Sequence, residues 1–248
     1  MTSKRRDPGG DREGDLQWDE VVDVICVGSS PGVLAYAIAC AAEEFDVALV
    51  HRPPDYDTDT LSYLAAMTDD LDGRPPHDVL EFFRAEPTQI RPDRRATVET
   101  FAGEQLRQWS ARCLASPVGV MFSEVPPMLT PMRTDTGELI TAAVLGANPS
   151  AGAPLTRWLD EQANEFSIDT PRDVLDGLIY QDGRLAGAAL QGESGRRLVA
   201  ASAGLAFSLG LAATEQLVLP ALPDASVALV GRRAGRFAKI ELLEQGRP

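Results

Sequence analysis

Lysine, histidine and aromatic residues are scarce in this sequence of 248 residues. Histidine occurs only at His51 and His77, so a histidine-rich metal site is excluded and a Ser-His-Asp triad is disfavoured. Lysine occurs only at Lys4 and Lys239, which leaves arginine as nearly the whole basic complement. That skew indicates a GC-rich bacterial genome and carries no information about function.

Cysteine and long apolar runs are also sparse. Cys26, Cys40 and Cys113 include no pair at C-x-x-C spacing, so neither a disulfide framework nor a zinc site is indicated. Cys26 and Cys40 lie in apolar segments and are expected to be small buried thiols. No apolar run reaches the roughly 18 residues that span a bilayer, and the first 15 residues have no apolar signal core. We therefore expect a cytoplasmic protein without membrane contact.

Acidic residues outnumber basic ones by 37 to 23, which gives a formal net charge of -14. A charge of this sign and size argues against nucleic acid or an anionic membrane as a partner. Hydrophobic residues make up 44% of the chain, which is enough to bury one substantial core. The length fits one domain with an insertion or two small domains.

The first ordered segment predicts a βαβ unit. Residues 1–16 are charged and rich in glycine, so they are expected to form a disordered tail. The run VVDVICV (21–27) is typical of a buried strand, GSSPG (28–32) of a turn, and the alanine-rich segment 33–45 of a helix. DVALV (46–50) predicts a second strand, which the connection should place parallel to the first.

The remainder of the chain predicts short helices followed by strands joined by turns. Asp182-Gly183 marks a hairpin within QDGR, and GESG marks a second turn. The expected helices are 58–71 (capped by Thr58 or Asp59), 79–85, 95–113 and 153–166; strands are expected at 118–122, 138–146, within 173–210 and at 226–233.

The segment WDEVVDVICVGSSPGVLAYAIACAAEEFDVALVHR (18–52) resembles the opening of the FAD-dependent fumarate reductase and 3-ketosteroid dehydrogenase family. The helix PLTRWLDEQANEF and the strands VLDGLIYQDGRLAGAAL and RRLVAASAGLAFSLG recur in the same order in that family. The resemblance covers most of residues 18–210. It implies an α/β, Rossmann-like FAD/NAD(P)-binding fold from residues 17–52 and 151–248, with a reduced, partly irregular cap insertion at 53–150.

The dinucleotide fingerprint of that family is altered in this chain. Gly28 matches the first glycine of G-x-G-x-x-G, whereas Ser30 and Val33 stand at the second and third. Gly32 lies one position too early to provide the close helix packing of the third glycine. The second strand ends in His51-Arg52 instead of the acid that should hold the ribose.

The resemblance therefore implies a weakened or lost FAD site. The altered positions reduce dinucleotide affinity by about 10²- to 10⁴-fold if their effects add. His51 and Arg52 could partly compensate by meeting a phosphate. The candidate cofactor-binding residues are Gly28, Ser29, Ser30, Gly32, His51 and Arg52.

The features of the family that lie closest to its redox chemistry are missing from the sequence. The Gly/Ser/Thr-rich flavin contact after the second strand is absent, and Ser208-Leu209-Gly210 replaces the family's Ala-Thr-Gly-Gly turn. None of the four tyrosines can be placed at the family's catalytic tyrosine. We assign no catalytic residue and no metal ligand from the sequence.

Three functions stay open at this point. The first is a degenerate flavoprotein-fold protein without redox activity of its own, acting as an accessory partner of a full-length flavoprotein or of itself, with PVGVMF (117–122) and LITAAVLG (139–146) as apolar contact surfaces. The second is an FAD-dependent oxidoreductase of steroid-like or enoyl substrates, completed by a second chain. The third is a sensor that binds a dinucleotide or another phosphate ligand at the Gly28 turn without redox chemistry.

Overall fold

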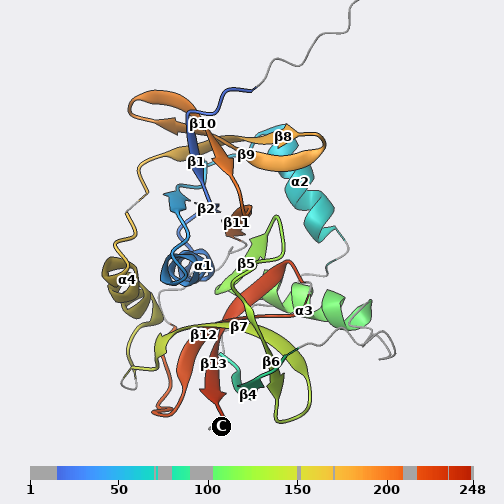
Figure 1. The fold of residues 1–248 in the computed structure, drawn as a ribbon, viewed down its shortest axis with the longest axis vertical. Helices are drawn as coiled ribbons and strands as arrows, with labels where there is room; N and C mark the ends of the chain where they lie inside the picture. The colour runs from blue at the N-terminus through green and yellow to red at the C-terminus, as the bar shows by residue number, and fades with distance from the viewer. Residues whose placement is uncertain are drawn as a thin grey trace, which may run out of the picture.

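The structure is a computed structural model that describes residues 16–69, 71, 80–89, 103–149, 152–169, 171–208, 217–233 and 235–246. Two mixed sheets with helices packed on them make this an α/β fold, as the sequence predicted (Figure 1). The tail predicted for residues 1–16 falls, apart from Leu16, outside the described residues. Across the described residues, every helix is too short or too polar to cross a membrane.

The predicted βαβ unit is confirmed. Strand β2 (Val24–Val27) is followed in the chain by helix α1 (Pro31–Ala42) and then by strand β3 (Val47–Val50). Strands β2 and β3 pair with each other in parallel. All four residues of β2 are fully buried, which explains the unbroken apolar run. The helix begins two residues earlier than predicted, because Pro31 suits the first helical position and Ser30 serves as the N-cap.

The larger sheet extends from this unit into a closed ring. Strand β11 (Leu205–Ser208) lies parallel to β2, and β5 (Gly119–Phe122) pairs antiparallel with β11 and with the start of β13. Since β12 pairs with both β7 and β13, five strands close on themselves at the lower end of Figure 1. The ring runs in the order β12 (Ser226–Gly231), β7 (Leu139–Ala147), β6 (Thr130–Thr134), β4 (Phe82–Pro87) and β13 (Phe237–Gln245). Hydrogen bonds thus join the segment expected as an insertion to strands 226–245.

A second sheet of four strands lies at the opposite end of the molecule (Figure 1). Asp182 (φ 51°) and Gly183 (φ 74°) form the predicted two-residue hairpin, which requires positive φ at both positions. The strands follow the order β1 (Glu20–Val22), β10 (Gly195–Ala201), β9 (Arg184–Gly192) and β8 (Val174–Gln181).

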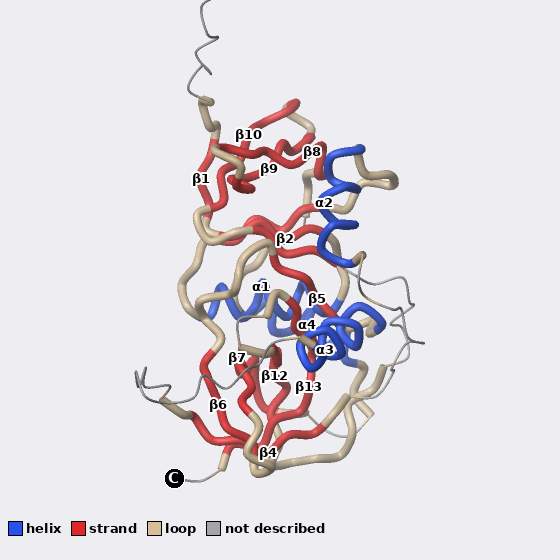
Figure 2. The backbone as a smooth tube through the Cα atoms, turned by 90° about the vertical axis from the view of Figure 1, so that its right-hand side faces the viewer, coloured by secondary structure: helices blue, strands red, loops and turns tan. Residues whose placement is uncertain are grey.

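Two apolar layers hold the sheets and helices together. On one face of the larger sheet, α1 and α4 (Leu155–Glu165) form one core with residues such as Tyr36 and Phe122. On the other face, the four-stranded sheet, α2 (Thr58–Thr68) and α3 (Glu104–Ala115) form the second core (Figure 2). The free thiols of Cys26, Cys40 and Cys113 are all buried, as expected for the first two.

Several local predictions were wrong. The helix expected at 79–85 is instead strand β4, because its pairing with β13 and β6 overrides the local preference. Helix α2 is capped by Asp57, whose carboxylate accepts the Thr60 N–H at 2.8 Å, and not by Thr58 or Asp59. The segment 117–122, expected as a partner surface, is buried along its whole length. The prediction for 95–102 lies outside the described residues.

Candidate functional site

Gly28 forms the tight turn after β2 that the sequence predicted. Its φ is +107°, and its N–H donates to the carbonyl of Val50 at 2.9 Å. A Cβ at this position would lie 2.8 Å from Cβ of Ser208 at the end of β11. Both the backbone conformation and the packing therefore require glycine here.

The start of α1 offers few groups to an anion. A helix N-terminus binds phosphate through its free N–H groups. Pro31 has no N–H, and the N–H of Val33 points to the Ser30 hydroxyl at 3.4 Å. Gly32 is buried, so Ser29 and the half-buried Ser30 are what the turn presents to solvent.

Gly32 provides the close helix packing that the fingerprint assigns to its third glycine. A Cβ on Gly32 would lie 2.4 Å from the carbonyl oxygen of Gly119 and 2.7 Å from that of Val118. The expectation that this role was lost is therefore corrected, since the contact is made one residue early and to β5. Val33 is fully buried against the core and does not project toward a ligand.

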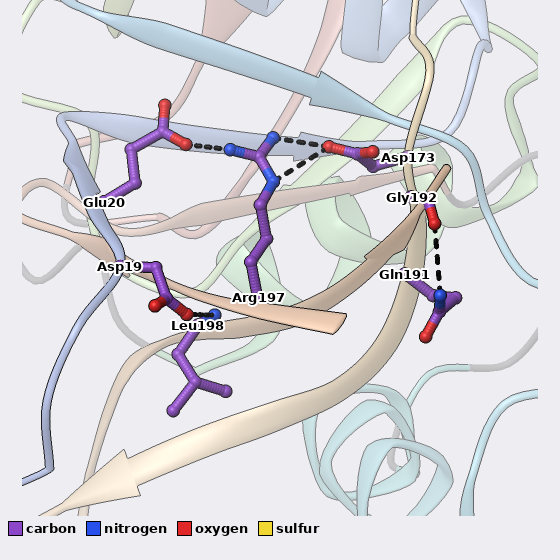
Figure 3. A network of polar contacts seen from close by, with 7 residues as sticks. All are labelled: Asp19, Glu20, Asp173, Gln191, Gly192, Arg197 and Leu198. Atoms are coloured by element: carbon purple, nitrogen blue, oxygen red, sulfur yellow. Dashed lines mark hydrogen bonds and ion pairs between the residues drawn. The ribbon is translucent and has the colours of Figure 1, made fainter. Parts of the chain in front are cut away.

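The backbone of His51 is held by the neighbouring sheet. Its N–H donates to the carbonyl of Asp173 at 2.7 Å, and its carbonyl accepts the N–H of Leu175. Figure 3 shows Arg197 between the carboxylates of Asp173 and Glu20, which ties this segment to β10 and β1. The His51 backbone is therefore fixed, while its side chain stays exposed.

The Arg52 side chain contacts Tyr56, in the segment that leads to α2. Its guanidinium carbon stands 4.9 Å from the ring centre of Tyr56, a cation–π distance. Tyr56 in turn packs against the second core, and burial raises the pKa of its hydroxyl. The structure therefore groups Gly28, Ser29, Ser30 and Gly32 in one turn, and the bond from the Gly28 N–H to the Val50 carbonyl brings the adjacent His51 beside that turn.

Sequence reasoning missed a cleft of about 380 Å³ beside the turn. Ser29 lies at its edge, and Leu34, Leu49 and Ile168 form apolar walls. Asp160 and Asp169 line it as well, together with Asn164 of α4. Apolar walls suit a flat ring, whereas two carboxylates repel a phosphate. The polar residues near the end of α4 were the feature of the sequence that could have indicated the cleft. No local sequence pattern, however, shows that they lie near Ser29 in the fold.

The buried thiols and phenol of β2 and α1 have no acid–base chemistry near neutral pH. Burial raises the pKa of Cys40 to about 12 and that of Cys26 well above its ordinary value. The pKa of Tyr36 is also raised, again because its hydroxyl is desolvated. Thiols and phenol therefore stay protonated, which suits packing and not nucleophilic catalysis.

A flavin dinucleotide is the ligand that the sequence resemblance implies, and the residues at the turn fit it poorly. Its diphosphate needs several converging N–H donors or a cation. The described turn offers Ser29 and Ser30, while Pro31 and the capped Val33 N–H offer none. The cleft beside Ser29 has Asp160 and Asp169 in its lining.

No protein-family model matches the chain, and no curated protein matches it. Among solved structures, it is similar to a geranylgeranyl bacteriochlorophyll reductase-like protein from Thermoplasma acidophilum. That similarity has 12% sequence identity and a TM-score of 0.30, and it covers 91% of this chain. The chain spans 57% of the length of that protein. A likeness this distant assigns no family.

Proposed function

We propose that this chain is a flavoprotein-like protein without redox chemistry of its own, which acts as an accessory subunit of a full-length flavoprotein. The observation that supports this proposal is the closed start of α1, which has few free N–H donors for a phosphate. Pro31 has no N–H, and the Ser30 hydroxyl accepts the N–H of Val33. Each charge-assisted hydrogen bond lost to a phosphate weakens binding by about 1.5–3 kcal/mol, so two account for roughly 10²- to 10⁴-fold.

The surface formed by α2 and β8 supports a role in binding another protein. Thr60 is the only described residue of α2 that is buried, although the helix is mostly apolar. Leu61 on α2 is 52% exposed and Tyr180 on β8 is 43% exposed. Tyr180 lies 6.4 Å from Tyr63 between ring centres, so Tyr63 and Tyr180 share one surface between α2 and β8. Exposed apolar surface of this kind is typical of a contact site.

Flavin titration tests the proposal. The purified protein is expected to be colourless and to bind added FAD at least 100-fold more weakly than the double variant Ser30→Gly/Pro31→Ala, which restores donors to the turn. Fluorescence quenching of FAD measures both affinities. Glu193→Ala, at the exposed turn between β9 and β10, is the control.

Stoichiometric flavin on the unmodified protein would contradict the absence of redox chemistry. Light scattering on the same sample tests the accessory role separately. A mass that stays at the 26.6 kDa of one chain in the presence of candidate full-length flavoproteins would contradict that role.

The cleft beside Ser29 favours a second candidate, an FAD-dependent oxidoreductase completed by a second chain. In that case the candidate contacts Gly28, Ser29, Ser30, Gly32, His51 and Arg52 would hold the dinucleotide, with its adenine in the cleft. Asn164→Trp fills the cleft from an exposed position and should then abolish FAD binding, whereas Glu165→Trp, on the next exposed residue, should not. Equal binding by both variants would exclude this candidate.

A further inference from the structure

Two oppositely charged side chains are buried on one face of β13. Lys239 is 1% exposed and Glu241 is fully buried. Being two residues apart in a strand, they point to the same side, and Nζ of Lys239 lies 2.9 Å from Oε1 of Glu241. That oxygen has no aligned hydrogen-bond donor among the described residues. Ion pairs this deeply buried rarely stabilise a fold, so stability alone does not explain the Lys239–Glu241 pair.

Polar contacts connect this pair directly to helix α3. The other carboxylate oxygen of Glu241 accepts the backbone N–H of Glu81, just before β4. The carboxylate of Glu81 forms an ion pair with Arg112 of α3. Lys239 and Glu241 also lie close enough to Cys113 of α3 to affect its pKa. The helix and the pair are therefore joined through one intervening residue.

Helix α3 covers the pair with only its second half. Figures 1 and 2 both place α3 beside β5 and β13. Trp109 is buried, and its Nε1 donates to the carbonyl of Phe237 at 3.0 Å. The indole ring also lies 4.6 Å from the guanidinium carbon of Arg232. By contrast, residues 104–108 are exposed apart from the half-buried Leu106. A helix attached by so short a stretch opens more easily than a fully packed one.

Lys239 of β13 lowers the pKa of Glu241, and the carboxylate of Glu81, just before β4, raises it. Arg112 of α3 and Arg232, just after β12, act on the neighbouring Cys113 thiol. Arg112 is paired with Glu81, and Arg232 with Glu138 at 2.9 Å. Lys239 is thus the main partner of Glu241.

Desolvation outweighs the attraction of Lys239, so burial raises the pKa of Glu241 from 4.5 to about 7. When α3 opens and water reaches Glu241, its pKa returns toward the ordinary value. The closed state therefore binds a proton more tightly than the open state. By linkage, closure is most favourable at acid pH, and this advantage is lost as the pH rises through about 7.

We propose that α3 is a proton-dependent lid over the Lys239–Glu241 pair, closing with proton uptake by Glu241 and opening more often as the pH rises. Opening exposes a lysine, a carboxylate and the Cys113 thiol at the edge of the five-stranded ring. This device is independent of the proposed accessory function.

Thiol labelling of Cys113 tests the lid. In a Cys26→Ala/Cys40→Ala background, Cys113 is the sole thiol and reacts only when α3 opens. The ratio of its labelling rate with Glu241 to that with Glu241→Gln cancels the pH dependence of the reagent. This ratio should rise about 30-fold between about pH 5.5 and about pH 8.5. At the higher pH, closure must bury an ionised carboxylate at Glu241, whereas a glutamine at this position carries no charge at either pH.

The matched control keeps Cys40 of α1 as the sole thiol in a Cys26→Ala/Cys113→Ala background. An equal rise at Cys40 would mean global unfolding and would overturn the lid, as would a ratio at Cys113 that does not change with pH. If Glu241→Gln does not fold, hydrogen exchange of the unmodified protein decides. Amides of α3 should then lose protection relative to those of α1 as the pH rises, after correction for intrinsic exchange, and equal loss would overturn the proposal.

Discussion

Replacing Lys239 with methionine is expected to lower the free energy of unfolding by about 3–5 kcal/mol at about pH 8. The substitution keeps the length of the side chain and removes its charge, so Glu241 is left as an unpaired carboxylate in a site that water does not reach. Acidification should reduce the loss, since burial already raises the pKa of Glu241 to about 7 beside Lys239, removal of that cation raises it further, and protonation then removes the unpaired charge. Urea unfolding at several pH values measures the effect.

The double variant Lys239→Met/Glu241→Gln should recover most of that stability. A glutamine oxygen can still accept the N–H of Glu81, and no charge then remains at the two positions. Arg157→Met is the control, since it breaks the exposed Arg157–Glu161 pair and should cost less than about 1 kcal/mol. If Lys239→Met costs no more than Arg157→Met, the pair is hydrated in solution and its described burial is wrong.

The elements that sequence predicted well are those defined by neighbouring residues. The βαβ unit followed from the apolar run 21–27, the glycine turn and the alanine-rich helix, and it is confirmed by the parallel pairing of β2 and β3. The β8–β9 hairpin followed from Asp182-Gly183. In both cases the preference of the local chain agrees with its final environment, so no distant contact was needed.

The ring of strands could not be predicted in the same way. Strand β13 is buried on both faces, yet its inward positions include Lys239 and Glu241. Polar residues at core positions break the alternation by which a strand is recognised. Strand β4 was predicted as a helix because its parallel partner, β13, is far away in the sequence. The closure of the ring depends on such distant pairings.

The candidate site was predictable in part. Gly28 was placed correctly because a tight turn must follow a buried strand. The role of Gly32 was missed because its partner, the backbone at Gly119, comes from a strand whose position in the sheet no local pattern gives. The cleft beside Ser29 was missed for the same reason, as Asp160 and Asn164 come from α4. Whether the turn holds a nucleotide stays a prediction.

Gly32→Ala should destabilise the protein by about 1–3 kcal/mol, opposite to the usual effect of this change within a helix. Alanine is ordinarily the better helix former by about 1 kcal/mol. Here the new methyl group would lie 2.4 Å and 2.7 Å from the carbonyl oxygens of Gly119 and Val118. Backbone atoms on both sides cannot rotate away, so α1 must move from β5. Thermal or urea unfolding measures the change.

Gly177→Ala is the matched control for crowding. Its new methyl group would meet only an oxygen of the Asp57 side chain, at 3.3 Å, and that side chain can shift. A small change at Gly177 together with a large loss at Gly32 would place the cost in the contact between α1 and β5. Should Gly32→Ala instead raise stability, the helix would not lie that close to β5, and the described packing of α1 would be wrong.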